Sequence, residues 1–232
     1  MRHGLRDPIS AVRAYQVLDL QIKEMGLHAT ISSDMKQFAH VRKTVRNDAV
    51  SPMFDPSINS FDDENSFWVE ARDDNGEVMA LEAFRLDIVD CKLSEWALRW
   101  MVGLYVIRNE LAVPSQFIVP DDSATQNLRG PFIYHGEVWV HSRFRTGELC
   151  TAFSRIGLIT SLIKWQPNVV WGLIVSKMAS RGLTVRMGYP HAERGFLKWN
   201  IPPKGADISE YVTFATKSDL EFLAHEIHTT QS

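Results

Sequence analysis

Hydrophobic residues recur at spacings of three and four in several stretches of the chain, which predicts amphipathic helices there. The first such stretch is 9–25, where Val12, Leu18 and Ile22 fall on one face. Pro8 stands at its start and Gly26 follows it, as is typical of helix ends. The other stretches with helical spacing are 35–45, 92–109, 149–165, 217–227 and a short one at 176–183.

Other apolar runs predict strands. The runs 67–72 and 77–89 flank Asn75-Gly76, a dipeptide typical of tight hairpins because both residues tolerate positive φ. The run 169–175 is apolar throughout, as expected of a strand that is buried on both faces. Further strands are expected at 27–31, 132–144 and 211–215.

The length of 232 residues suits one domain with a sizeable core. We interpret 1–232 as a single domain with an N-terminal helix within 1–26. Residues 110–129 show no clear periodicity, and we interpret 92–131 as an insertion. Helices and strands that alternate in this way indicate an α/β fold with a mixed sheet.

Composition narrows the classes of partner. The net charge is −3 and the pI about 6.2, so bulk electrostatics indicates no nucleic-acid partner. Cys91 and Cys150 are too few for a disulfide framework or a four-ligand zinc site, so we expect a reducing, cytoplasmic compartment and no metal. The longest apolar stretches are too short to cross a bilayer, so we expect no membrane partner.

The most informative chemical feature is the polar turn between the strand 132–144 and the helix 149–165. A helix N-terminus offers unpaired N–H groups and the positive end of the helix dipole. Gly147 allows a close approach to these groups, and Arg143 and Arg145 add positive charge, so the turn would suit a diphosphate. The alternative is an ordinary turn with solvated arginines.

The segment Trp139-Val140-His141-Ser142-Arg143-Phe144-Arg145-Thr146-Gly147-Glu148-Leu149 resembles the cofactor motif of the GNAT superfamily of N-acetyltransferases. In that family a strand leads through Arg/Gln-x-x-Gly-x-Gly/Ala into a helix. The hairpin at Asn75-Gly76 resembles the family's second and third strands, and 169–189 resembles its fifth strand, the next helix and a Gly-aromatic turn. The resemblance covers about 27–215 and implies a GNAT-like acyl-CoA N-acyltransferase fold, in which strands 132–144 and 169–175 are parallel neighbours that splay apart.

The resemblance implies an enzyme that moves an acetyl or other acyl group from acetyl-CoA, or another acyl-CoA, to an amine of a small molecule or protein. It makes a homodimer possible. The residues that it implies for coenzyme A binding are Trp139, Val140, His141, Arg143, Arg145, Thr146, Gly147, Glu148, Leu149, Cys150 and Ser176.

The sequence departs from the family pattern at four positions, which keeps other functions open. Glu148 stands where glycine is expected and Cys150 where Gly or Ala is expected; Ser142 replaces the usual proline, and Thr184 occupies the place of the family's tyrosine acid. A carboxylate beside a diphosphate is unfavourable, so one alternative is a non-catalytic GNAT-like module with a degenerate site. Another is an acyl-homoserine-lactone synthase, whose Ser-Arg-Phe strand the stretch 140–144 resembles, although His141 replaces the usual acidic residue.

Amide formation requires a neutral amine and a proton for the departing thiolate. Glu137, on the strand before the turn, is the candidate base, since that strand sometimes supplies a carboxylate in the family. Tyr189 is the candidate hydroxyl donor, and His135 or His141 could act instead. A solvent-facing carboxylate and a packing tyrosine are the alternatives for Glu137 and Tyr189.

Overall fold

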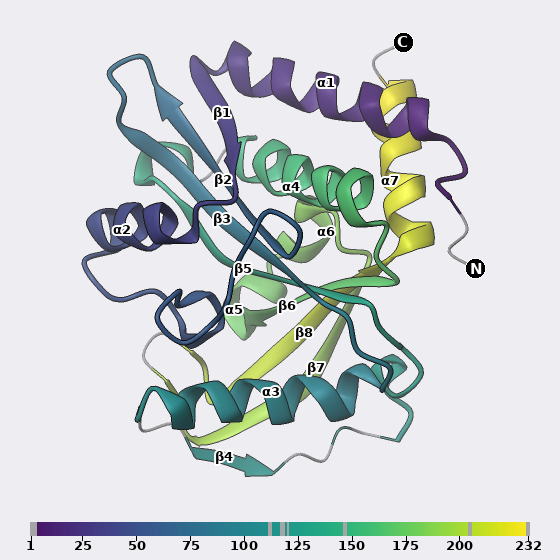
Figure 1. Ribbon diagram of the computed structural model, residues 1–232. Coiled ribbons are helices and arrows are strands. Elements are labelled where there is room, and N and C mark those ends of the chain that lie inside the picture. The colour runs from purple at the N-terminus through teal and green to yellow at the C-terminus, as the bar shows by residue number, and fades with distance from the viewer. Residues whose placement is uncertain are drawn as a thin grey trace.

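The computed structural model describes residues 4–110, 113–116, 119, 121–145, 148–203 and 206–230. Eight strands form one mixed sheet in the order β1-β2-β3-β5-β6-β8-β7-β4 (Figure 1). All neighbouring strands are antiparallel except β5 and β6, which are parallel. The strands are β1 (Leu27–Ser32), β2 (Ser66–Asp73), β3 (Val78–Asp87), β4 (Val113–Gln116), β5 (Phe132–Val140), β6 (Val169–Val175), β7 (His191–Ile201) and β8 (Ser209–Thr216).

Helices cover both faces of this sheet. Aspartate side chains cap the N-termini of the first two helices. The Asp7 side chain accepts from the Ser10 N–H, and the Asp34 side chain accepts from the backbone N–H groups of Lys36 and Gln37. The helices are α1 (Pro8–Glu24), α2 (Met35–Arg46), α3 (Leu93–Ile107), α4 (Leu149–Trp165), α5 (Ser176–Ala179), α6 (Leu183–Met187) and α7 (Lys217–Thr230), with 3-10 turns η1 (Pro52–Phe54), η2 (Ala124–Gln126) and η3 (Ser142–Phe144).

A separate apolar core lies on each face of the sheet. One core, on what we call the α4 face, packs α1, α4 and α7 against the strands through residues such as Leu18 and Phe153. The other, on the α3 face, includes residues of α2, η1 and α3, with Phe38, Phe54 and Trp171 among its members. In Figure 1, α3 lies along one side of the sheet, far from α1 and α7.

Strands β5 and β6 pair over only a short length. The ladder contains Phe132–Val169, Ile133–Val170 and Tyr134–Trp171, and both strands then continue without further pairing to each other. Strand β3 stays paired with β5, and β8 with β6, so the separation is confined to the middle of the sheet. Together with the antiparallel β2–β3 hairpin, this confirms the GNAT-like α/β fold that the resemblance implied.

Several sequence predictions need correction. The strand expected at 132–144 ends at Val140, and η3 follows it. The helix expected at 176–183 is divided into α5 and α6. Strands β7 and β4 were not predicted; β4 lies at the edge of the sheet, beside β7. The segment 92–131 contains α3, β4 and η2, and its interpretation as an insertion in a single domain stays a prediction. None of the described helices is long and apolar enough to span a membrane.

Candidate functional site

A bulge interrupts β5 just after its pairing with β6 ends. Trp139 is opposite Leu81 and Gly136 is opposite Ala83, so β5 has one more residue than β3 across this interval. Glu137 has a φ of +58°, in the left-handed region that few non-glycine residues adopt. As a result His135 contacts groups on the α4 face, while Trp139 packs against the core of the α3 face.

The Glu137 carboxylate fastens this bulge to neighbouring segments. Its Oε2 accepts from Arg42 Nε of α2 at 2.6 Å, and its Oε1 accepts from the Ser51 N–H at 2.7 Å. Only 4% of the side chain is exposed, so the alternative of a solvent-facing carboxylate is wrong. Both oxygens are engaged within the protein, and a direct catalytic role stays a prediction.

The turn after β5 is held by local hydrogen bonds. The His141 Nδ1 accepts from the Arg143 N–H at 3.3 Å, and Arg145 Nε donates to the Val140 carbonyl at 3.2 Å. The Arg143 and Arg145 side chains are exposed, so their charges face solvent. Thr146 and Gly147, at the centre of the expected diphosphate site, lie outside the described residues.

The start of α4 combines an exposed and a buried residue. Glu148 precedes the helix, is exposed, and makes no side-chain cap hydrogen bond, whereas Leu149 is fully buried. Burial, followed by the charge of Glu82, raises the pKa of the Cys150 thiol, so this cysteine stays protonated near neutrality. Of the residues expected to bind coenzyme A, Glu148, Leu149 and Cys150 thus lie at the N-terminal end of α4.

Ser176 lies at the end of β6, and its polar groups have partners within the protein. Its N–H donates to Asp207 Oδ2 at 2.7 Å, and its hydroxyl donates to the Ser209 carbonyl at 3.0 Å. A ligand group that accepts a hydrogen bond from the Ser176 N–H or hydroxyl would compete with these bonds.

Tyr189 belongs to a buried polar chain on the α4 face. Its hydroxyl lies 2.6 Å from His135 Nδ1, and His135 Nε2 lies 3.1 Å from Glu82 Oε2. All three residues are buried, and burial raises the pKa of both Tyr189 and Glu82. Glu82 was not predicted from the sequence. The one signal that could have identified it is that Glu82 is the only charged residue in the apolar run Met79-Ala80-Leu81-Glu82-Ala83.

A second group that sequence reasoning missed lies on the α3 face. We call Glu210, Tyr105, Tyr134 and Trp199 the Glu210 cluster. Trp199 Nε1 donates to Glu210 Oε2 at 3.0 Å. Burial raises the pKa of Glu210 to about 7; the Trp199 hydrogen bond opposes this shift and the charge of Asp207 adds to it. No motif marks these residues, because they come from α3, β5, β7 and β8.

The two tyrosines of the cluster have raised pKa values. Burial raises the pKa of Tyr134, and the next contributions come from Tyr105, Glu210 and Glu137. Burial likewise raises the pKa of Tyr105, followed by the charge of Glu210. The Tyr105 ring contacts that of Trp199, whose indole donates to Glu210, and Tyr134 is the last residue of β5 that pairs with β6.

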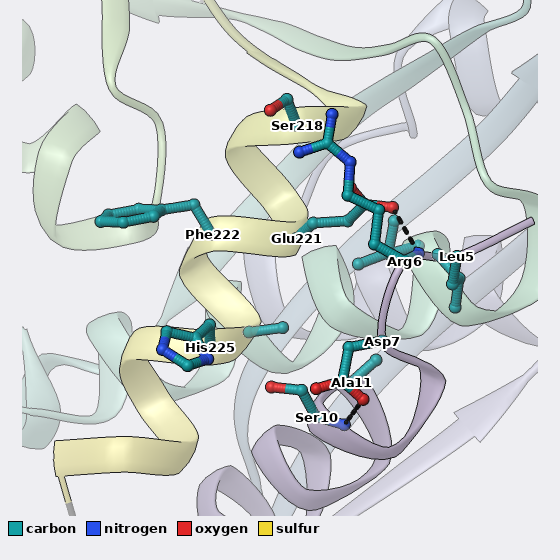
Figure 2. A pocket seen from close by; sticks show the side chains of 11 residues that line it. Leu5, Arg6, Asp7, Ser10, Ala11, Ser218, Glu221, Phe222 and His225 are labelled. Carbon is teal, nitrogen blue, oxygen red and sulfur yellow. Dashed lines mark hydrogen bonds and ion pairs between the residues drawn. The ribbon is translucent and has the colours of Figure 1, made fainter.

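A pocket elsewhere in the molecule does not share these features. It lies between the segment leading into α1 and the helix α7, and its lining includes Asp7, Ser10 and His225 (Figure 2). The Arg6 N–H donates to Glu221 there at 3.1 Å. Within the described part of the chain, no group of three or more His, Cys, Asp or Glu residues is arranged to hold a metal.

Comparison with known proteins finds solved structures that this chain is similar to, but no match at the level of sequence. No protein-family model matches the sequence, and the comparison with curated proteins found no match. The solved structure of Arabidopsis thaliana NAA60 in complex with acetyl-CoA is 13% identical, has a TM-score of 0.47, and matches over 82% of this chain and 98% of that chain. An acetyltransferase of the GNAT family from Streptococcus pneumoniae is 8% identical, with a TM-score of 0.45 and coverage of 82% and 99%.

Mycobacterium smegmatis RimJ in complex with CoA-disulfide is 11% identical, has a TM-score of 0.43, and matches over 97% of this chain and 86% of that chain. The solved structures that this chain is similar to thus include GNAT acetyltransferases. At these identities and TM-scores, no residue role is carried over from them.

Proposed function

We propose that this GNAT-like chain is an N-acyltransferase that moves an acetyl or other acyl group from acyl-CoA to an amine. The observation that carries the proposal is the separation of β5 from β6 beyond Tyr134–Trp171, next to a turn that leads into α4. Backbone N–H and C=O groups without a ladder partner can bind the amide-containing pantetheine arm of coenzyme A. The N-terminus of α4 offers further N–H groups to its diphosphate.

For the cofactor we propose the junction of β5 and α4. The exposed guanidinium groups of Arg143 and Arg145 supply charge, and backbone amides from 145 to 150 receive the diphosphate. Trp139 and Val140 lie on opposite faces of the strand that leads there. The Arg145 Nε bond to Val140 leaves the outer guanidinium nitrogens for a phosphate.

For the reaction we propose supporting roles for the two predicted catalytic residues. Glu137 holds the bulge of β5 through Arg42 and Ser51, and thereby fixes the backbone that would face the acyl group. Tyr189 orients the His135 ring, which Glu82 holds from the other side. Both act by keeping the wall of the site rigid.

Calorimetric titration with coenzyme A tests the proposal. Arg145→Ala should weaken binding by about 1.5–3 kcal/mol, since it removes a charge-assisted hydrogen bond. Arg194→Ala, which removes an exposed arginine of β7, is the matched control and should bind as the wild type does. An absence of binding by the wild type, or equal affinity in both variants, would reject this site.

Glu148→Gly separates an active enzyme from a degenerate module. A carboxylate about 4 Å from a phosphate oxygen costs on the order of 4 kcal/mol at an effective dielectric of 20. Because the Glu148 side chain is exposed and makes no cap hydrogen bond, we expect it to avoid the diphosphate and the variant to keep the wild-type affinity. A marked gain in affinity, together with no thiol release from acetyl-CoA and amines, would instead identify a binding module.

A further inference from the structure

Glu210 has no ion pair with a cationic side chain among the described residues; Glu193, opposite Val212 on the same face, also lacks one, but both of its oxygens accept hydrogen bonds, from Ser123 and Ala124. Three carboxylates on or beside this face each pair with an arginine. These pairs are Glu137 with Arg42, Asp87 with Arg85, and Asp55 with Arg108.

The surroundings of Glu210 are apolar and aromatic. Only 7% of the residue is exposed, and its Oε2 accepts from Trp199 Nε1. Its Oε1 has no hydrogen-bond partner in the described part of the chain. The Tyr105 ring meets the Trp199 ring edge-on, with centroids 5.7 Å apart. Aromatic faces attract cations, so this environment suits an ammonium group beside an apolar body.

Glu210 also lies at the level of the separated strands. It is opposite Val175, four residues beyond Trp171, where β6 last pairs with β5. The bulge at Glu137 lies at the same level on the β5 side. Glu210 therefore stands across the separation from the bulge, on the α3 face.

We propose that the Glu210 cluster binds the ammonium group of the acyl acceptor and that the Glu210 carboxylate takes its proton. The acceptor class is a small primary amine with an apolar or aromatic body, since α3 and η1 belong to the core that covers this face. This inference rests on the proposed acyltransferase function.

In the proposed reaction, the acceptor nitrogen loses two protons in turn. The ammonium gives one proton to the Glu210 carboxylate and becomes a neutral amine. The amine nitrogen forms a bond to the thioester carbonyl carbon, and the carbon–sulfur bond then breaks. The nitrogen's second proton goes to the departing thiolate, giving an amide and free thiol, and Glu210 returns its proton to water. Because the pKa of Glu210 is about 7, its carboxyl is a better base than an ordinary glutamate.

The test compares a cationic probe with a neutral one of similar size. Phenethylammonium and phenethyl alcohol are titrated into the protein with coenzyme A present, at pH 8. The wild type should prefer the cation at least tenfold, and Glu210→Gln should abolish the preference while leaving coenzyme A affinity unchanged. Glu193→Gln is the matched control, because it changes a carboxylate of neighbouring β7 whose oxygens bind Ser123 and Ala124.

The preference should also fade as pH falls through about 7 and Glu210 gains a proton. Several titratable or charged groups act on Glu210 or on the tyrosines of its cluster. They are Asp207, which precedes β8; Tyr105 of α3, with Arg108 and Glu110 just after that helix; Arg85 of β3; and Tyr134 and Glu137 of β5. A wild type without cation preference, or a preference that survives in Glu210→Gln, overturns the inference. A protein that binds no coenzyme A at all contradicts the proposed acyltransferase function instead.

Discussion

At the scale of single residues, the protonation of Glu210 links the site to folding. The pKa of this carboxyl is about 7 in the folded protein and ordinarily 4.5. At pH values between 4.5 and about 7, Glu210 is more often protonated in the folded protein than in the unfolded chain, so the folded state binds more protons. The free energy of unfolding must therefore fall as pH rises through that interval, and the contribution of Glu210 is complete only at lower pH.

Replacing Glu210 with glutamine should remove this dependence. The side chain keeps its shape and can still accept from Trp199, but it no longer ionises. The difference in unfolding free energy between Glu210→Gln and the wild type should grow in favour of the variant by about 3 kcal/mol from pH 4.5 to pH 7. Urea denaturation at several pH values measures it. Parallel pH curves for the two proteins would show that Glu210 titrates normally.

The candidate cofactor residues could be predicted from the sequence because they are contiguous. Arg143, Arg145 and Glu148 follow one strand and precede one helix, and the order of elements is visible in the periodicity. Glu210 could not be found in this way. Glu210 and the other members of its cluster belong to four different elements, and only the fold shows that Glu210 forms no ion pair with a described cationic residue.

At the scale of elements, α4 packs on the sheet at very short range. Gly157 is in the middle of this helix, and a Cβ there would lie 2.5 Å from two carbons of the Phe84 ring and closer still to Glu82 Oε1. The absent side chain thus lets the helix axis approach β3, where Glu82 and Phe84 both support His135.

Gly157→Ala should therefore destabilise the protein by about 1–3 kcal/mol, the usual cost of overpacking a core. The matched control is Gly103→Ala in α3, where an added Cβ meets nothing within 4 Å. That change should stabilise the protein by roughly 0.5–1 kcal/mol through helix propensity. Urea denaturation compares the two variants. Similar effects of both substitutions would show that α4 does not pack so closely.

The predictability of the elements follows their environment. The bounds predicted for α4 and β6 are those observed, because long apolar periodicity and a continuous apolar run are strong signals. Strand β7 escaped prediction because charged residues such as Glu193 and Arg194 interrupt it, and a bulge after Arg194 breaks its alternation. Strand β5 ends early because the chain enters η3, which has no hydrophobic signature.

At the scale of the whole molecule, the sheet is a shared wall between two different environments. The α4 face carries the buried chain Glu82–His135–Tyr189, and the α3 face carries the Glu210 cluster. Each set includes a residue of β5 at the end of its pairing with β6, namely His135 on the α4 face and Tyr134 on the α3 face. An acyl group held at the separation would have proton-carrying groups on both sides of the sheet.

The packing of α1 against α7 brings distant parts of the chain together (Figure 1). Arg6 and Glu221, which are 215 positions apart in sequence, are in contact. Contacts between such remote positions can form only after a long loop has closed, and this loss of chain entropy slows folding. We therefore expect the docking of α1 on α7 to be part of the rate-limiting step of folding.

A circular permutant would shorten the loop that the contact between α1 and α7 closes. A flexible linker of about eight residues between the present ends, with new ends between Asp121 and Asp122, would leave Arg6 and Glu221 roughly 25 residues apart. The entropy cost of closing that loop would fall by about 2 kcal/mol, so refolding followed by stopped-flow fluorescence should be faster. An unchanged refolding rate in a correctly folded permutant would mean that the α1–α7 contact forms after the rate-limiting step.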